Sequence, residues 1–196
     1  MEEGEHTAIV PSKRLVTNAK RKSEPKSSRK GEPSFFMSES MKRLSTPWSV
    51  ASIRARQIDP MALPAGVILD AAAGSGIQLI AFSKILKRPA LGVEIDRDVA
   101  KLCAANMFLN SEGDVQRSLD RVLVGDGCSA ESAVSTYWSS LREAGTRAHP
   151  PVAMLHIDPA RPRDAQNHSL DEMEPDIKSI LKGWSSHLQT GPKGPA

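Results

Sequence analysis

The sequence predicts an α/β fold in which a parallel sheet carries helices on both of its faces. The chain has 196 residues, of which 39% are hydrophobic, enough for one ordinary domain and a tail. Between residues 67 and 188, short apolar runs alternate four times with segments of helical periodicity. Each of these runs ends at a glycine turn or an acidic residue, and sheets of this kind bind ligands beyond the carboxyl ends of their strands.

The first forty residues predict a disordered basic arm, followed by an ordered domain over residues 41–196. Between Lys13 and Lys30 stand eight Lys or Arg residues and a single acid, Glu24, with serine and proline in the gaps. Such a stretch has too few apolar side chains to offset the entropy that ordering would cost. Two interpretations stay open: the arm binds the phosphates of a nucleic acid, or it is a solvated tail with no partner.

The ordered part is expected to begin with a helix. Thr46 and Pro47 are typical of a helix start, with threonine as the N-cap and proline in the first turn, and Pro60 ends the segment. The apolar runs that follow predict strands, and the periodic segments between and after them predict helices. The strands are expected at residues 67–69, 90–93, 121–124 and 152–157, and the helices at 77–86, 97–107, 130–144 and 170–188.

The first predicted strand leads into a turn of small residues, Asp70-Ala71-Ala72-Ala73-Gly74-Ser75-Gly76. Small side chains let a ligand approach the backbone, and the helix that follows points its first amides at that ligand. A dinucleotide-binding turn would have a third glycine where this chain has Leu79. The carboxylate of Asp70 also disfavours a diphosphate and favours an ammonium group. Both residues argue against an oxidoreductase with a nucleotide cofactor.

Two further acids follow predicted strands. Glu94 lies 18 residues after Gly76, where a carboxylate can accept hydrogen bonds from ribose hydroxyls. Asp96 competes for that role, but its position favours the N-cap of the next helix. Asp126 either accepts from an adenine amino group or serves its own Gly-Asp-Gly turn.

In their order and spacing, the segments VILDAAAGSG, GVEID, VGDG and HIDPAR resemble a Rossmann-like (class I) S-adenosylmethionine-dependent methyltransferase. The variant after the fourth strand is similar to the Asp-Pro-Ala-Arg branch of archaeal and bacterial RNA methyltransferase-like proteins. The resemblance implies S-adenosyl-L-methionine as the cofactor and a base in RNA as the substrate. It also implies a set of cofactor-binding residues, namely Asp70, Ala71, Ala72, Gly74, Gly76, Glu94 and Asp126. Ala72 stands where the family usually has its first glycine.

The same resemblance places the chemistry after the fourth strand, at Asp158 and Pro159. Asp158 would orient a target amine or remove its proton, since methyl transfer depends mainly on how the acceptor is aligned. Arg161 would contact the substrate through a phosphate or a base. It is equally well placed in the sequence to pair with Asp164 or Glu172.

No metal and no membrane partner are expected. The histidines show no ligand spacing, and the two cysteines, Cys103 and Cys128, form no CxxC pair. His156 lies inside a predicted strand and is expected to be a core histidine. Unpaired thiols and the lack of a signal-peptide pattern favour a cytoplasmic protein. No apolar run approaches the about 20 residues of a membrane span.

The family's sheet has seven strands, whereas about four are predicted here. The segment from Gly191 to Ala196 resembles the turn before a fifth strand. The fold is therefore expected to be incomplete, with the fifth strand and the terminal hairpin missing. Two functions stay open: a methyltransferase acting on a base in RNA, or a non-catalytic module that binds the cofactor or RNA.

Overall fold

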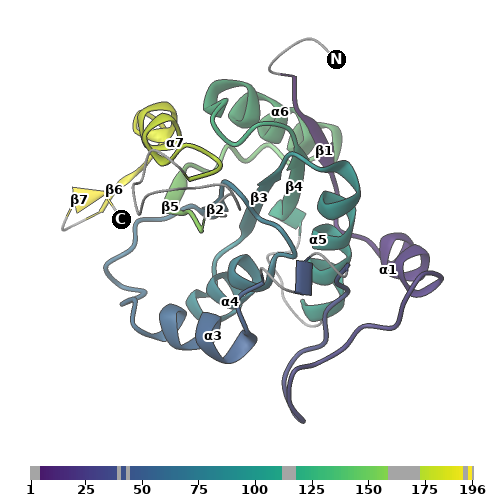
Figure 1. Ribbon diagram of the computed structural model, residues 1–196. Helices are drawn as coiled ribbons and strands as arrows, with labels where there is room; N and C mark the ends of the chain where they lie inside the picture. Colours follow the sequence, from purple (N-terminus) through teal and green to yellow (C-terminus); the bar gives the residue numbers. More distant parts are fainter. Residues whose placement is uncertain are drawn as a thin grey trace.

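A five-stranded sheet forms the centre of the molecule, with the strand order β1-β4-β3-β2-β5 (Figure 1). The computed structural model describes residues 5–38, 41–42, 45–111, 118–158, 173–191 and 194–195. The four predicted strands are present as β2 (Val67–Asp70), β3 (Ala90–Glu94), β4 (Arg121–Val124) and β5 (Val152–His156). These four run parallel to one another.

The fifth strand, β1 (Thr7–Ile9), pairs antiparallel with β4 at one edge of the sheet. The sheet is therefore mixed, and the prediction of a wholly parallel sheet is wrong at this edge. An antiparallel edge strand on an otherwise parallel sheet is common in large α/β folds. β1 has only three residues and lies in the basic N-terminal segment, so the apolar pattern of the sequence does not reveal it.

Helices precede, connect and follow the parallel strands at the places that the periodicity predicts. They are α3 (Trp48–Arg56), α4 (Ile77–Leu86), α5 (Arg97–Asn110), α6 (Ala130–Glu143) and α7 (Ile177–Trp184). After α7, two short strands, β6 (Thr190–Gly191) and β7 (Gly194–Pro195), pair with each other. Within the described residues, no helix combines the length and the apolar character that crossing a membrane requires.

The helices cover both faces of the sheet, because successive side chains of its central strands point to opposite faces and are buried on both. In β2, Ile68 belongs to the core that α3, α4 and α5 share, whereas Val67 and Leu69 belong to the core that α6 and α7 share. Trp184 of α7 is fully buried in the second core, and its indole N–H donates to the carbonyl of Gly127 at 2.8 Å. The prediction of helices on both faces is confirmed.

The N-terminal segment is folded against the domain, so the prediction of a disordered arm is wrong for residues 5–38. Helix α1 (Lys13–Lys20) turns Leu15, Val16 and Ala19 toward α5, where they pack with Phe36. These three apolar residues are few, but their i, i+1, i+4 spacing gathers them on one face of the helix. The segment folds because its apolar residues share one helical face, although they are few in number.

Asn106 of α5 fastens this segment to the glycine turn. Its side chain is fully buried and accepts a hydrogen bond from the backbone N–H of Phe36 at 2.7 Å. Its amide nitrogen donates to the carbonyls of Phe36 and Ser75, each at 2.9 Å. Burying a side-chain amide costs free energy unless its polar atoms form hydrogen bonds of this kind. The path of residues 35–36 and the shape of the glycine turn are therefore coupled through one side chain.

Beyond α7 the chain begins to pair with the outer edge of β5. Leu188 forms a parallel bridge with Val152, and the N–H of Gln189 donates to the Val152 carbonyl at 2.8 Å. This is the position that a further parallel strand would occupy. The expectation of an incomplete sheet stays a prediction.

Candidate functional site

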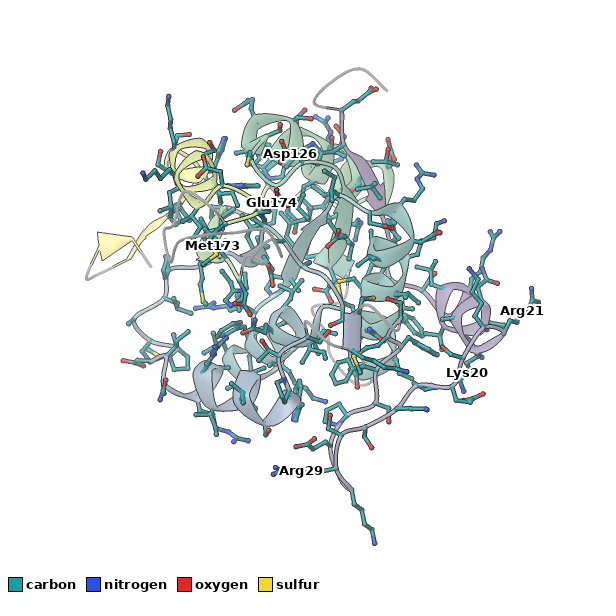
Figure 2. The ribbon with its side chains drawn as sticks, in the orientation of Figure 1. Lys20, Arg21, Arg29, Asp126, Met173 and Glu174 are labelled. Carbon is teal, nitrogen blue, oxygen red and sulfur yellow. The ribbon has the colours of Figure 1, made fainter. Side chains whose placement is uncertain are left out.

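A cavity of about 820 Å³ lies at the carboxyl ends of the parallel strands. Its size falls within the range of sites that bind a cofactor or another small molecule. Residues 70–75 of the glycine turn form one part of its wall, and Glu94, Asp126 and Asp158 from three other strand ends also line it. Asp126 and Glu174, which both line this cavity, are labelled in Figure 2. The predicted acids are thus brought together around one space.

The glycine turn takes its shape from two backbone positions that only glycine adopts readily. Gly74 has φ of +50° and Gly76 has φ of +78°. A Cβ at position 76 would also lie 2.7 Å from the sulfur of Cys103. The first carboxylate of the site supports the same turn, because Asp70 Oδ1 accepts from the Ala72 N–H at 3.1 Å. Helix α4 starts here with no side-chain cap on its first amides.

Glu94 joins the end of β3 to the glycine turn. Its Oε2 accepts from the Gly74 N–H and its Oε1 from the Asp96 N–H, both at 2.9 Å. Each carboxylate oxygen keeps a second lone pair for a ligand hydroxyl. Burial raises the pKa of the Glu94 carboxyl above its usual value, although the two backbone hydrogen bonds act in the opposite direction.

Asp96 caps helix α5, as its position in the sequence indicates. Its Oδ1 accepts from the backbone N–H of Asp98 at 2.8 Å and of Val99 at 3.1 Å. Both bonds satisfy donors at the start of the helix. Glu94 is therefore the acid at this strand end that lines the cavity.

Asp126 serves its turn and lines the cavity at the same time. Its Oδ1 accepts from the Cys128 N–H at 2.9 Å. On the other side of the turn, His6 Nε2 donates to the Asp126 carbonyl at 3.0 Å, and His6 Nδ1 bonds the hydroxyl of Ser132 at 2.9 Å. A Cβ at Gly125 would lie 2.3 Å from the His6 ring. Sequence reasoning missed His6, because nothing in an apparently disordered arm links it to this turn.

Asp158 lies just after β5, with 46% of its side chain exposed, and three residues from other elements surround it. Thr46 Oγ1 donates to Asp158 Oδ2 at 3.1 Å, and the amide nitrogen of Gln78 donates to the same oxygen. Arg54 Nη1 lies 3.8 Å from that oxygen and donates to Gln78 Oε1 at 2.7 Å. These contacts fix the carboxylate while leaving nearly half of it accessible to a substrate.

The role of Thr46 differs from the predicted one. Pro47 occupies the N-cap position of α3, and no side chain caps that helix. Thr46 instead bonds Asp158, which lies 112 residues further along the chain. Among the other residues predicted for this corner, Pro159 and Arg161 lie outside the described residues.

Asp70 is paired beneath the cavity with His156 of the neighbouring strand. His156 Nδ1 lies 3.2 Å from Asp70 Oδ2, and the imidazole packs against Phe82 with 5.0 Å between ring centroids. Burial lowers the pKa of a histidine, but the hydrogen bond and charge of Asp70 outweigh it, with a smaller effect from Asp158. The pKa of His156 is raised above its usual value as a result. The expected core role of His156 agrees with this paired, mostly buried position.

Among the described residues, no group of three or more His, Cys, Asp or Glu side chains is arranged to hold a metal ion. Cys103 is buried and Cys128 is partly buried, and both are free thiols. Burial raises the pKa of Cys128 to about 11, with a further contribution from Asp126. Both thiols are poor nucleophiles in this state.

No model of a protein family matches the chain. No similar protein was found among curated proteins either. The assignment of function therefore depends on the chemistry of the site itself.

Proposed function

We propose that this protein is a Rossmann-like S-adenosylmethionine-dependent methyltransferase that acts on a base in RNA. One observation carries the proposal: three adjacent parallel strands, β2, β3 and β4, each end in an acid that lines the same cavity. These acids are Asp70, Glu94 and Asp126. Their order across the sheet matches the order of three groups along the cofactor, an ammonium, a pair of ribose hydroxyls and an adenine amino group.

The chemistry of each acid suits its partner in this assignment. Asp70 is an anion next to a turn of small residues, which favours the positively charged amino-acid end of the cofactor. Glu94 offers one remaining lone pair on each oxygen, enough for two hydroxyls. Asp126 lines the cavity with a carboxylate that can accept from an amino group in addition to its hydrogen bonds with Cys128. Ile95, with 75% of its surface exposed, adds an apolar contact for an aromatic ring.

The acceptor site is assigned to Asp158. The cofactor supplies an electrophilic methyl group bound to a positively charged sulfur. Among the described residues, the contacts from Thr46, Gln78 and Arg54 all reach Oδ2 of Asp158, so Oδ1 can accept a hydrogen bond from a target amine. Such a bond would hold the lone pair of the amine in line for transfer and receive its proton afterward.

Calorimetric titration with S-adenosylhomocysteine tests the cofactor site. We expect micromolar binding by the wild-type chain. Asp126→Asn keeps the acceptor for the Cys128 N–H but replaces the second oxygen with a donor, so binding should weaken about tenfold to a hundredfold. Asp98→Asn is the matched control, because this exposed acid lies outside the cavity, and it should leave binding unchanged.

Transfer of a radioactive methyl group to total RNA tests the activity, with nuclease-treated RNA as the blank. Label in RNA that Asp158→Asn abolishes would support the assignment. Binding of the cofactor without transfer to RNA would instead indicate a non-catalytic binding module. No binding by a chain with a folded spectrum would overturn the proposal.

A further inference from the structure

We propose that the folded N-terminal segment, residues 13–30, is a docking surface for the phosphate backbone of RNA. The choice of RNA as the polyanion rests on the proposed function. The evidence for the docking surface is the charge, the exposure and the anchoring of this segment, and none of these observations depends on the cavity.

The segment concentrates positive charge, with a single acid, Glu24, among its eight cations. It holds eight of the 26 Lys and Arg residues and one of the 23 Asp and Glu residues, so it carries +7 while the rest of the chain carries −4. All eight cations are exposed, namely Lys13, Arg14, Lys20, Arg21, Lys22, Lys26, Arg29 and Lys30. None of them lies within ion-pair distance of an acid among the described residues. Such a surface attracts a polyanion over the distance of a Debye length.

Four of the cations lie on or directly after helix α1, which is anchored to α5. The apolar face of α1 packs on α5, which leaves Lys13, Arg14, Lys20 and Arg21 on the outward side. Figure 2 shows Lys20 and Arg21 directed away from the body of the molecule, with Arg29 on the loop that follows. Side chains on an anchored helix lose less entropy on binding than those of a disordered arm.

The loop that carries Arg29 and Lys30 is also closed at its base. Lys26 and Phe35 exchange two backbone hydrogen bonds, at 3.0 and 2.9 Å, and Phe35 is buried in the core. Residues 27–34 therefore form a tethered loop in place of a free tail. This loop follows α1 (Figure 1), and its exposed cations Arg29 and Lys30 continue the positive charge of the helix.

The basic segment and the cavity share helix α5 as a neighbour. Leu102 of α5 packs in the same apolar cluster as Ala19 of α1. Lys101, and more weakly Lys22, also lower the pKa of the Asp98 carboxyl in the first turn of α5. The same turn contains Val99, which lines the cavity, and it directly follows Glu94 and Ile95. A nucleic acid held on α1 therefore lies beside the helix whose first turn lines the cavity.

The composition of the segment indicates how it recognises RNA. Residues 13–30 contain no Phe, Tyr or Trp, so base stacking is not available to them. Lysine and arginine contacts to phosphates do not discriminate sequence, and they weaken steeply with salt. Selection of the base is left to the cavity.

Fluorescence anisotropy with a labelled single-stranded RNA of about 20 nucleotides tests the surface, over a range of salt concentrations. The test variant is the triple substitution Lys20→Gln, Arg21→Gln and Lys22→Gln, which alters exposed side chains only. The matched control removes the same charge from α6 and α7 and the loop after α6, through Arg142→Gln, Arg147→Gln and Lys182→Gln. Each protein is also titrated with S-adenosylhomocysteine.

We expect the test variant to bind RNA about tenfold more weakly, with a salt slope smaller by about two, and the control to bind like the wild type. Two RNAs of different sequence should bind with similar affinity. Equal RNA binding by the test variant and the control would overturn the proposal. So would binding to phosphatidylserine vesicles without binding to RNA. The cofactor titration tests a separate claim. If S-adenosylhomocysteine does not bind while RNA binding is intact, the methyltransferase assignment is overturned and the docking surface is not.

Discussion

Replacing Asn106 with alanine tests how the N-terminal segment is held to the cofactor turn. The variant removes a fully buried amide that bonds Phe36 twice and Ser75 once. Each bond contributes about 1 kcal/mol, and each buried backbone group left without a partner costs about 1–3 kcal/mol. Because these terms overlap, we expect a loss of about 3–4 kcal/mol in the free energy of unfolding. For a chain of this size that corresponds to a Tm lower by about 10 °C.

Urea unfolding followed by tryptophan fluorescence measures this loss, and hydrogen exchange at the Phe36 amide shows where it arises. Asn18→Ala is the control, since Asn18 is exposed on α1 and its replacement should change stability by less than about 0.5 kcal/mol. A loss below about 1 kcal/mol for Asn106→Ala would show that Asn106 does not hold the N-terminal segment in place. Unchanged protection of the Phe36 amide would contradict this role as well.

Three further predictions follow from the geometry of the site. His6→Ala releases the turn that holds Asp126, so the affinity for S-adenosylhomocysteine should fall about threefold to tenfold in calorimetry, at a cost of about 1–3 kcal/mol in stability. Gly76→Ala places a Cβ against the Cys103 sulfur at a φ of +78°, and denaturant unfolding should show a loss of about 2–4 kcal/mol together with weakened cofactor binding. The raised pKa of His156 means that its pairing with Asp70 stabilises the fold fully below pH 6.5, the usual value, and that this contribution is lost as pH rises through the raised value. The free energy of unfolding of the wild type should therefore fall over this window relative to His156→Gln, in urea titrations at several pH values.

Each of these predictions has an outcome that contradicts it. Wild-type affinity in His6→Ala would show that the Asp126 turn needs no support from the His6 side chain. A stable Gly76→Ala would mean that Cys103 and the turn can move apart. Parallel pH profiles for the wild type and His156→Gln would exclude the pairing with Asp70 as a source of pH dependence.

The sequence predicts the central parallel strands and their helices because burial on two faces imposes a pattern that local residues reveal. It also predicts the acids at three strand ends, since the carboxyl ends of neighbouring parallel strands meet at one edge. The sequence does not reveal β1 or α1. The few apolar side chains of α1 are buried only by packing against α5, a tertiary contact that no local pattern shows. Composition alone therefore predicts disorder for a segment whose apolar residues share one helical face.

The partners of Asp158 are the other part of the site that sequence reasoning misses. Thr46, Arg54 and Gln78 come from the start of α3, its last turn and the first turn of α4, and the packing of these two helices brings them together. No local pattern links residues so far apart in the chain. The roles of Pro159 and Arg161 stay predictions, because both lie outside the described residues.

The most direct test of the cofactor site is an NMR titration of the isotope-labelled full chain with S-adenosylhomocysteine. We predict shifts of the backbone amides at Gly74, Glu94, Ile95 and Asp126, at three different strand ends, and none at exposed Arg142 on α6. Such a result would establish that the three acids serve one ligand. Shifts confined to other surfaces, or a spectrum that does not change, would contradict the cofactor site and with it the proposed function.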